Sequence, residues 1–192
     1  MTQENRFDPN AVAYYEKSGW QAYYDRNWLH VLWLMVQLNR EQFRMSLPTA
    51  IGAAIDVVRA SVAFAPVDND VPAATDHLER YYAKARAAAG IETDAATLST
   101  LEMDYWVVHR KLAIDRKLAA DHAGDIEPMV ASLERLHTAL FDAPADAIRR
   151  SAELRAQAAA TVDRITGGYS EDVEGDWMQV EEILCQAYRE VS

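Results

Sequence analysis

The placement of proline is the feature that most restricts how this chain can fold. Its six prolines stand at positions 9, 48, 66, 72, 128 and 144, and each lies at the edge of a segment long enough to form a helix. Proline is disruptive inside a helix, because it lacks a backbone N–H, but it is favoured in the first helical turn. The spacing therefore predicts a series of helices separated by short breaks.

Capping residues and glycines place the remaining boundaries of these segments. Asp70 and Asp125 each precede a proline by a few residues and are expected to cap helices, and Gly90 is expected to close one. Ser18-Gly19 and the glycine pair Gly167-Gly168 are expected to mark the ends of two further helices. The expected helices cover about 9–17, 20–45, 48–65, 71–89, 94–121, 126–143, 145–165 and 176–190.

No segment shows the alternation of apolar and polar residues, bounded by turns, that is typical of strands. With 192 residues, of which 50% are hydrophobic and 26% charged, the chain is long enough to bury one core. We therefore expect an all-α fold, a single-domain bundle of about seven helices over residues 1–192. It would begin with an aromatic-rich segment, 1–19, and contain an acidic linker, 167–175, before the last helix.

The charge balance argues against several classes of partner. A formal net charge of −11 and a pI of about 4.8, without any basic run, predict repulsion from nucleic acid and from anionic membrane surfaces.

The longest uninterrupted apolar run, 31–36, is far shorter than the roughly 20 residues of a membrane span. The single Cys185 and the polar N-terminal sequence favour the cytoplasm.

The segment 48–65 carries only two charged residues, Asp56 and Arg59, among aliphatic and alanine side chains. This composition predicts a helix buried on nearly all sides. Charges at such a place are costly unless they are paired, and a spacing of three lets these two pair with each other. The functional alternative is that Arg59 presents its guanidinium to a bound carboxylate or phosphate while Asp56 holds it in place.

The segment 94–121 contains a mixed polar strip. Glu102, Trp106, His109 and Arg110 share one side of the helix, so a carboxylate, an indole and an imidazole could converge on a ligand or ion. Glu102 and His109 are then candidates for acid–base catalysis, and the alternative is a solvated strip. Two apolar stripes on this helix predict two buried faces: Leu98, Leu101, Tyr105, Val108 and Leu112, and Met103, Val107, Ile114 and Leu118.

His137 falls in the centre of the apolar face expected for 126–143, with Glu134 three residues before it. Glu-x-x-His is the half-motif that di-iron bundles supply twice. Here it occurs once, so a core histidine with its hydrogen bonds satisfied is favoured, and a metal site at Glu134 and His137 is the weaker alternative. The sequence predicts no other metal ligands and indicates no particular cofactor.

The segment 20–45 has one coherent polar strip between two apolar faces. It includes His30, which is either part of a solvated face or part of the lining of a cleft. Further along the chain, the sequence from Pro72 to Asp76 and His77 resembles the signature of the assembly chaperones of molybdenum enzymes. In this chain Pro72 lies two residues too far from the Asp-His pair, and the Glu-Leu that would follow is absent.

Two functions remain open on these observations. The first is a helical bundle that binds a small anionic or amphipathic ligand in an internal cleft and turns it over by acid–base chemistry, with Arg59, Asp56, Trp106, Arg110 and His30 as binding residues. The second is an interaction protein, an assembly chaperone or accessory subunit of a larger enzyme, with exposed aromatic residues as anchors. A di-iron-like oxidoreductase is a further alternative. Self-association is expected in either case, because several helices need cover on more than one side.

Overall fold

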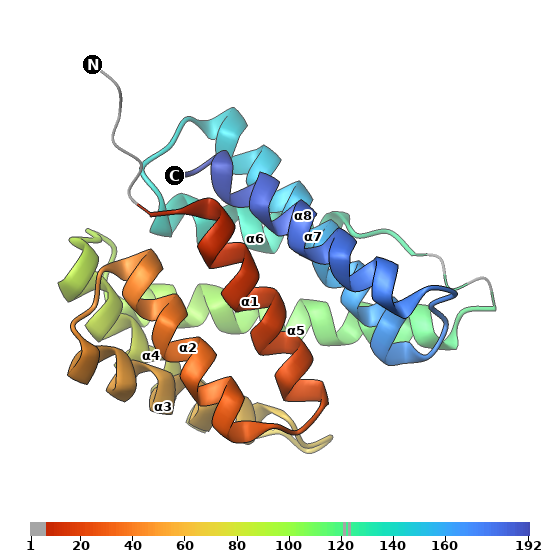
Figure 1. Ribbon diagram of the computed structural model, residues 1–192, viewed down its shortest axis with the longest axis horizontal. Coiled ribbons are helices and arrows are strands. Elements are labelled where there is room, and N and C mark those ends of the chain that lie inside the picture. The colour runs from red at the N-terminus through yellow and green to blue at the C-terminus, as the bar shows by residue number, and fades with distance from the viewer. Residues whose placement is uncertain (1–6, 121, 123) are drawn as a thin grey trace. The chain divides into compact units, whose positions relative to one another are not determined.

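The computed structural model describes residues 7–120, 122 and 124–192, and all regular structure in them is α-helical (Figure 1). This confirms the all-α prediction. The first six residues of the expected segment 1–19, and Asp121 at the expected end of the fifth helix, lie outside the described residues. The helices are α1 (Pro9–Tyr24), α2 (Trp28–Phe43), α3 (Leu47–Phe64), α4 (Val71–Ala89), α5 (Ala95–Leu118), α6 (Glu127–Leu140), α7 (Ala145–Gly167) and α8 (Val173–Arg189).

The helices belong to two compact units, and the division falls within α5. The first unit ends at Met103, and the second runs from Asp104 to Val191. In the first, α1 packs against α2, α2 against α3, and α3 against α4. In the second, α7 packs against both α6 and α8. The expectation of one domain over the whole chain stays a prediction.

Side-chain caps explain why several helices begin where they do. The carboxylate of Asp8 accepts a hydrogen bond from the backbone of Asn10, and Asp70 accepts one from Ala73 in the same way. Such caps satisfy N–H groups that have no partner within the helix. Gly90 closes α4 in the left-handed conformation, with a φ of 69°, as expected from the sequence.

The predicted break at Ser18-Gly19 is wrong, because α1 continues through both residues to Tyr24. A Cβ on Gly19 would lie 2.7 Å from the Met35 side chain, so this glycine permits close approach of α1 and α2. The actual break follows Tyr24, and Asn27 caps α2 by accepting a hydrogen bond from the backbone of His30. Gly19 therefore serves helix packing rather than helix termination.

Two predictions of burial also need correction. In α3, Ile51, Ile55, Arg59 and Val62 are exposed, so this helix is not buried on nearly all sides. In α5 the residues Leu98, Met103 and Tyr105 are buried, but the stripe expected at Val107, Ile114 and Leu118 faces solvent. Sequence periodicity shows which side chains share a helix face, but it does not show whether another element covers that face.

The expected acidic linker 167–175 is shorter in the structure. Gly167 ends α7, Gly168 adopts a φ of 81°, and Asp172 caps α8 through the backbone of Gly175. Glu174 and Asp176 thus lie in the first turn of α8, where the partial positive charge of the helix N-terminus favours acidic groups.

Leu34 and Leu29 provide a test of the first unit's packing, because both lie on α2 in opposite environments. Leu34 is fully buried against Ala22 and Val31, whereas Leu29 is 84% exposed. We predict that Leu34→Ala lowers the free energy of unfolding by about 2–4 kcal/mol through lost contacts and a cavity. Leu29→Ala should change it by less than about 0.5 kcal/mol in the same urea titration. Equal effects would contradict this packing.

Candidate functional site

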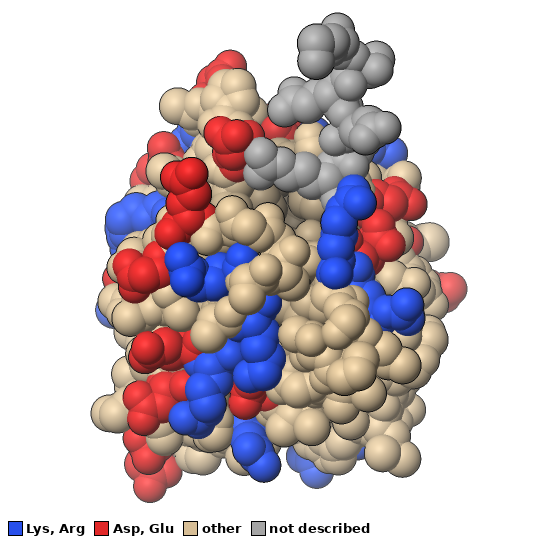
Figure 2. Space-filling model, turned by 90° about the vertical axis from the view of Figure 1, so that its left-hand side faces the viewer, with Lys and Arg blue, Asp and Glu red and all other residues tan. Residues whose placement is uncertain are grey.

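A positively charged hollow lies in the first unit, where α2 ends, α3 begins and α4 passes beside them. Its volume is about 590 Å³. Figure 2 shows a face on which Lys and Arg side chains gather in a band over the middle, with Asp and Glu side chains along one side of it and a broad uncharged area along the other. We call the site the basic hollow. Its lining residues are Arg44, Ser46, Thr49, Arg80, Ala83, Lys84, Ala87 and Ala88.

Local backbone structure brings the polar lining residues of α2 and α3 to the basic hollow. Arg44 caps α2 with a φ of 55°, a left-handed conformation that reverses the chain into α3. Ser46 then caps α3: its hydroxyl accepts from the backbone N–H of Thr49 at 3.4 Å and lies 2.8 Å from the Thr49 hydroxyl. These two helices and the turn between them thus contribute one guanidinium, two hydroxyls and the partially positive N-terminus of α3.

The cations that α4 contributes are arranged around a buried carboxylate. Asp56 of α3 is buried, and Lys84 donates a hydrogen bond to its Oδ2 at 2.6 Å. The Nε of Arg80 lies 3.9 Å from Asp56 Oδ1, and its Nη2 lies 2.6 Å from Nδ1 of His77. Asp56 therefore offsets part of the positive charge that Arg80 and Lys84 bring to the basic hollow.

His77 responds to the same group of charges. Burial of its ring, and then the positive charges of Arg80 and Arg59, lower the pKa of His77 below its usual value. At neutral pH the imidazole therefore favours its neutral form. It adds no positive charge, and its nitrogen can accept a hydrogen bond from Arg80.

The predicted pairing of Asp56 with Arg59 is not what the structure shows. Asp56 pairs across the helix interface with Lys84 and, at longer range, with Arg80. Arg59 is exposed and does not line the basic hollow. The sequence correctly singled out Asp56 as a charge that needs a partner, but the partner lies on the next helix, 28 residues away.

The candidate catalytic residues of α5 have separate partners. Glu102 belongs to the first unit and accepts a hydrogen bond of 2.9 Å from the Tyr82 hydroxyl. His109 belongs to the second unit, and its Nε2 lies 2.9 Å from Oδ1 of Asp163. Trp106 and Arg110, the binding residues expected beside them, are half-buried. Proton transfer by Glu102 and His109 stays a prediction.

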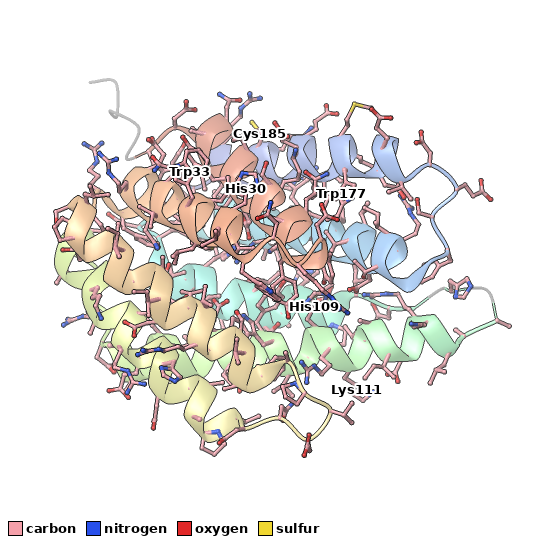
Figure 3. The ribbon with its side chains drawn as sticks, turned by 60° about the horizontal axis from the view of Figure 1, so that its bottom comes forward. His30, Trp33, His109, Lys111, Trp177 and Cys185 are labelled. Atoms are coloured by element: carbon pink, nitrogen blue, oxygen red, sulfur yellow. The ribbon has the colours of Figure 1, made fainter. Side chains whose placement is uncertain are left out.

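His109 is part of a charged cluster that sequence reasoning missed. Asp163 of α7 is buried and contacts both His109, through Oδ1, and Arg116, through Oδ2. The Tyr105 ring stacks on His109 with the centroids 5.6 Å apart. Figure 3 shows His109 on α5. The one signal in the sequence was Asp163 itself, an acid that follows the apolar stretch from Ala158 to Val162 in α7.

His30 lies on the exposed side of α2, beside Trp33, with the two ring centroids 6.0 Å apart (Figure 3). Trp33 is about half exposed, as are Trp28 of the same helix and Tyr14 and Tyr24 of α1. Exposed aromatic residues on the first two helices are what the interaction hypothesis expects. The prediction that His30 contributes to a ligand site is not tested by these contacts.

Glu134 and His137, the alternative metal ligands, have other contacts in the structure. Glu134 pairs with Arg149 at 3.0 Å, and Arg149 also binds Glu127 and Glu153. His137 is fully buried against Phe141, and its Nδ1 has no hydrogen-bond partner. Within the described residues, no three His, Cys, Asp or Glu side chains are grouped so that they could hold a metal ion.

Lys84 and Arg59 give a direct test of which cation stabilises Asp56. We predict that Lys84→Met, which leaves the buried carboxylate without its closest partner, lowers the free energy of unfolding by about 1–3 kcal/mol. Arg59→Met should cost less than about 0.5 kcal/mol. Combining Asp56→Leu with Lys84→Met should recover much of the loss. The prediction fails if Arg59→Met proves the more destabilising single change in urea unfolding.

His137 predicts a specific loss of stability in acid. Its burial, and then the charge of Arg155, lower its pKa in the folded protein to about 3 from 6.5. The unfolded chain therefore binds a proton first, and stability falls as the pH drops from about 6.5 toward 3. Between pH 7.5 and 5 the native protein should lose about 2 kcal/mol more than His137→Gln. Parallel pH dependences of urea unfolding would contradict a neutral, buried His137.

Comparison with known proteins returns no match to any family model, curated protein or solved structure. The contacts, charges and burial of the chain itself are therefore the basis for assigning a function.

Proposed function

We propose that the protein binds a small anionic ligand in the basic hollow. The observation that supports this most directly is the convergence of Arg44, Arg80 and Lys84 on one hollow, in a chain whose net charge is −11. Acidic residues outnumber Lys and Arg in this chain by 30 to 19, yet three of the cations and no acidic residue line this one hollow. Ordered positive groups beside a cavity favour carboxylates and phosphates.

The dimensions and lining of the basic hollow suit a small molecule. The hollow is open to solvent and not an enclosed cavity, so with a volume of about 590 Å³ it suits a small anion that stays partly exposed. Ala83, Ala87 and Ala88 of α4 supply a floor of short apolar side chains, and the Ser46 and Thr49 hydroxyls supply polar groups at one side. This pattern favours an anion with a compact apolar part, such as a phosphate ester of a small alcohol.

Each cation would act in a different way. The Arg80 guanidinium offers several N–H donors in a plane, while the Lys84 ammonium acts as a point charge that Asp56 already holds in place. The N-terminus of α3 adds partial positive charge near Ser46 and Thr49. The proposal concerns binding, because the residues expected to perform acid–base chemistry, Glu102 and His109, do not line the basic hollow.

Phenyl phosphate, with phenol as a neutral control, tests this proposal. We predict that calorimetry detects binding of phenyl phosphate but not of phenol, and that saturating phosphate ester raises the melting temperature by linkage. Ala87→Glu places an acid in the lining at an exposed position and should weaken binding at least tenfold. Ala89→Glu, on the same helix but outside the lining, should change it less than twofold, apart from the long-range effect of the added charge.

The two alanine variants also show which results would contradict the proposal that the basic hollow binds an anion. Equal binding by Ala87→Glu and Ala89→Glu would place the anion elsewhere, and no heat or thermal shift with millimolar phenyl phosphate would contradict the proposal. Arg44→Gln and Arg26→Gln form a second matched pair, because both arginines adopt left-handed backbone conformations in the first unit. Only Arg44→Gln should weaken binding. Circular dichroism should show that all four variants are folded.

A further inference from the structure

α3 leaves an apolar stripe on the surface. Leu47, Ile51, Ile55 and Val62 are between 38% and 62% exposed. Val58 lies at the edge of this series, where it is half-buried and packs against the core cluster of Ala22, Val31 and Leu34. The four exposed side chains are spaced by four, four and seven residues, so they follow one side of the helix. The stripe extends over about four turns, or roughly 22 Å. We call it the α3 stripe.

The opposite side of α3 fixes the helix within the first unit. It packs against α2 and α4, and Asp56 joins it to Lys84 of α4. By length and composition alone, α3 is the one described helix that could cross a membrane, with a hydropathy of 1.4 and 33% of it buried. A side packed on two helices and held by an ion pair instead favours a folded unit with one apolar side exposed to water.

The spacing of the α3 stripe favours a helical partner. Apolar residues spaced by four and seven positions lie along one side of a helix, where a second helix can pack against them. An exposed stripe of aliphatic side chains without a partner is costly in water and is a common mark of an interaction surface. A partner helix of similar length would cover the stripe.

Charge beside the α3 stripe restricts the chemistry of that partner. On the helical projection, Arg59 lies between the stripe and Asp56, which faces α4. Arg80, whose side chain is about half exposed, and Lys84 extend this positive border on α4. Asp56 offsets one of the three charges. Acidic residues beside an apolar seam would therefore complement the border.

A second copy of the chain fits this border less well. If two α3 helices packed face to face and antiparallel about a two-fold axis, each positive border would lie against the same border of the other copy. An acidic helix from another protein would instead place carboxylates against the positive border.

We propose that the α3 stripe binds an amphipathic helix of another protein, whose apolar seam is flanked by Asp or Glu residues. The aliphatic side chains of the stripe supply the contact area, and Arg59 selects for the acidic flank. The proposal goes beyond anion binding, because Ile51, Ile55 and Arg59 do not line the basic hollow, whereas Arg80 and Lys84 border both surfaces.

A pair of labelled 18-residue helical peptides tests the proposal on the full chain. Both carry leucines at alternating spacings of three and four; one has Glu beside the seam and the other has Lys. Fluorescence anisotropy should show at least tenfold tighter binding of the Glu peptide, with the difference shrinking as salt is raised. Arg59→Glu should weaken binding of the Glu peptide at least tenfold and strengthen that of the Lys peptide.

Matched variants connect the binding to α3. Ile51→Asn with Ile55→Asn should abolish peptide binding and leave the helical circular dichroism intact, because both side chains are substantially exposed. Ile114→Asn changes an exposed isoleucine of α5 and should bind the Glu peptide as the native protein does. Equal binding of the two peptides, or binding of neither, would overturn the proposal.

Two other occupants of the α3 stripe give distinct results. Sedimentation showing a dimer that the Ile51 and Ile55 double variant dissociates would assign the stripe to a second copy and overturn the proposal. Cosedimentation with phosphatidylserine vesicles, lost in the same variant, would assign it to an anionic lipid surface and also overturn it. A monomer that stays in solution in both experiments and binds the Glu peptide supports the acidic helix.

Discussion

A carboxylate buried at Asp56 requires a cation, and this requirement organises the first unit. Removing an unpaired charge from water costs several kcal/mol, so the fold must bring a positive side chain to it. Lys84 and Arg80 meet the requirement from α4, one turn apart, and thereby set how α4 lies along α3. The same arrangement places these two cations beside the N-terminus of α3 and creates the basic hollow.

Buried acids have a similar role in the second unit. Asp163 joins α7 to α5 through Arg116 and His109, and Asp176 joins α8 to α7 through Arg164. The hydrogen bonds from Arg164 hold the pKa of Asp176 below its usual range, so the ion pair persists to acidic pH. Each of these pairs connects two helices of the same unit. Paired charges therefore add specific contacts between neighbouring helices in both units.

The helices could be predicted because local residues determine where they begin and end. Features that depend on contacts between helices could not be predicted. Prolines, Asp70 and Gly90 act within a few residues of their own positions, so their effect can be inferred from the sequence. Gly19 was misread because its role depends on Met35, on another helix. Asp56 was recognised as a charge in need of a partner, but the local candidate Arg59 could not be distinguished from Lys84 without knowing how α3 and α4 pack.

The site residues show the same limit from the functional side. His109 was selected for its place on a polar strip, yet the feature that gives it a fixed environment, Asp163, is 54 residues away. The basic hollow combines residues from α2, α3 and α4, none of which forms a motif by itself.

The apolar residues of α3 lie on two different sides of the helix, one buried and one exposed. Apart from Asp56 and Phe64, its buried residues are small, Ala50, Ala53, Ala54 and Ala60, and allow close packing in the first unit. Its exposed side instead carries large aliphatic residues, which a solvated face does not require. If α3 had to pack only within this chain, charged residues at its exposed positions would be hydrated more favourably than large aliphatic ones. The contrast between small residues inside and large ones outside is the physical argument that the α3 stripe is retained for contact with another molecule.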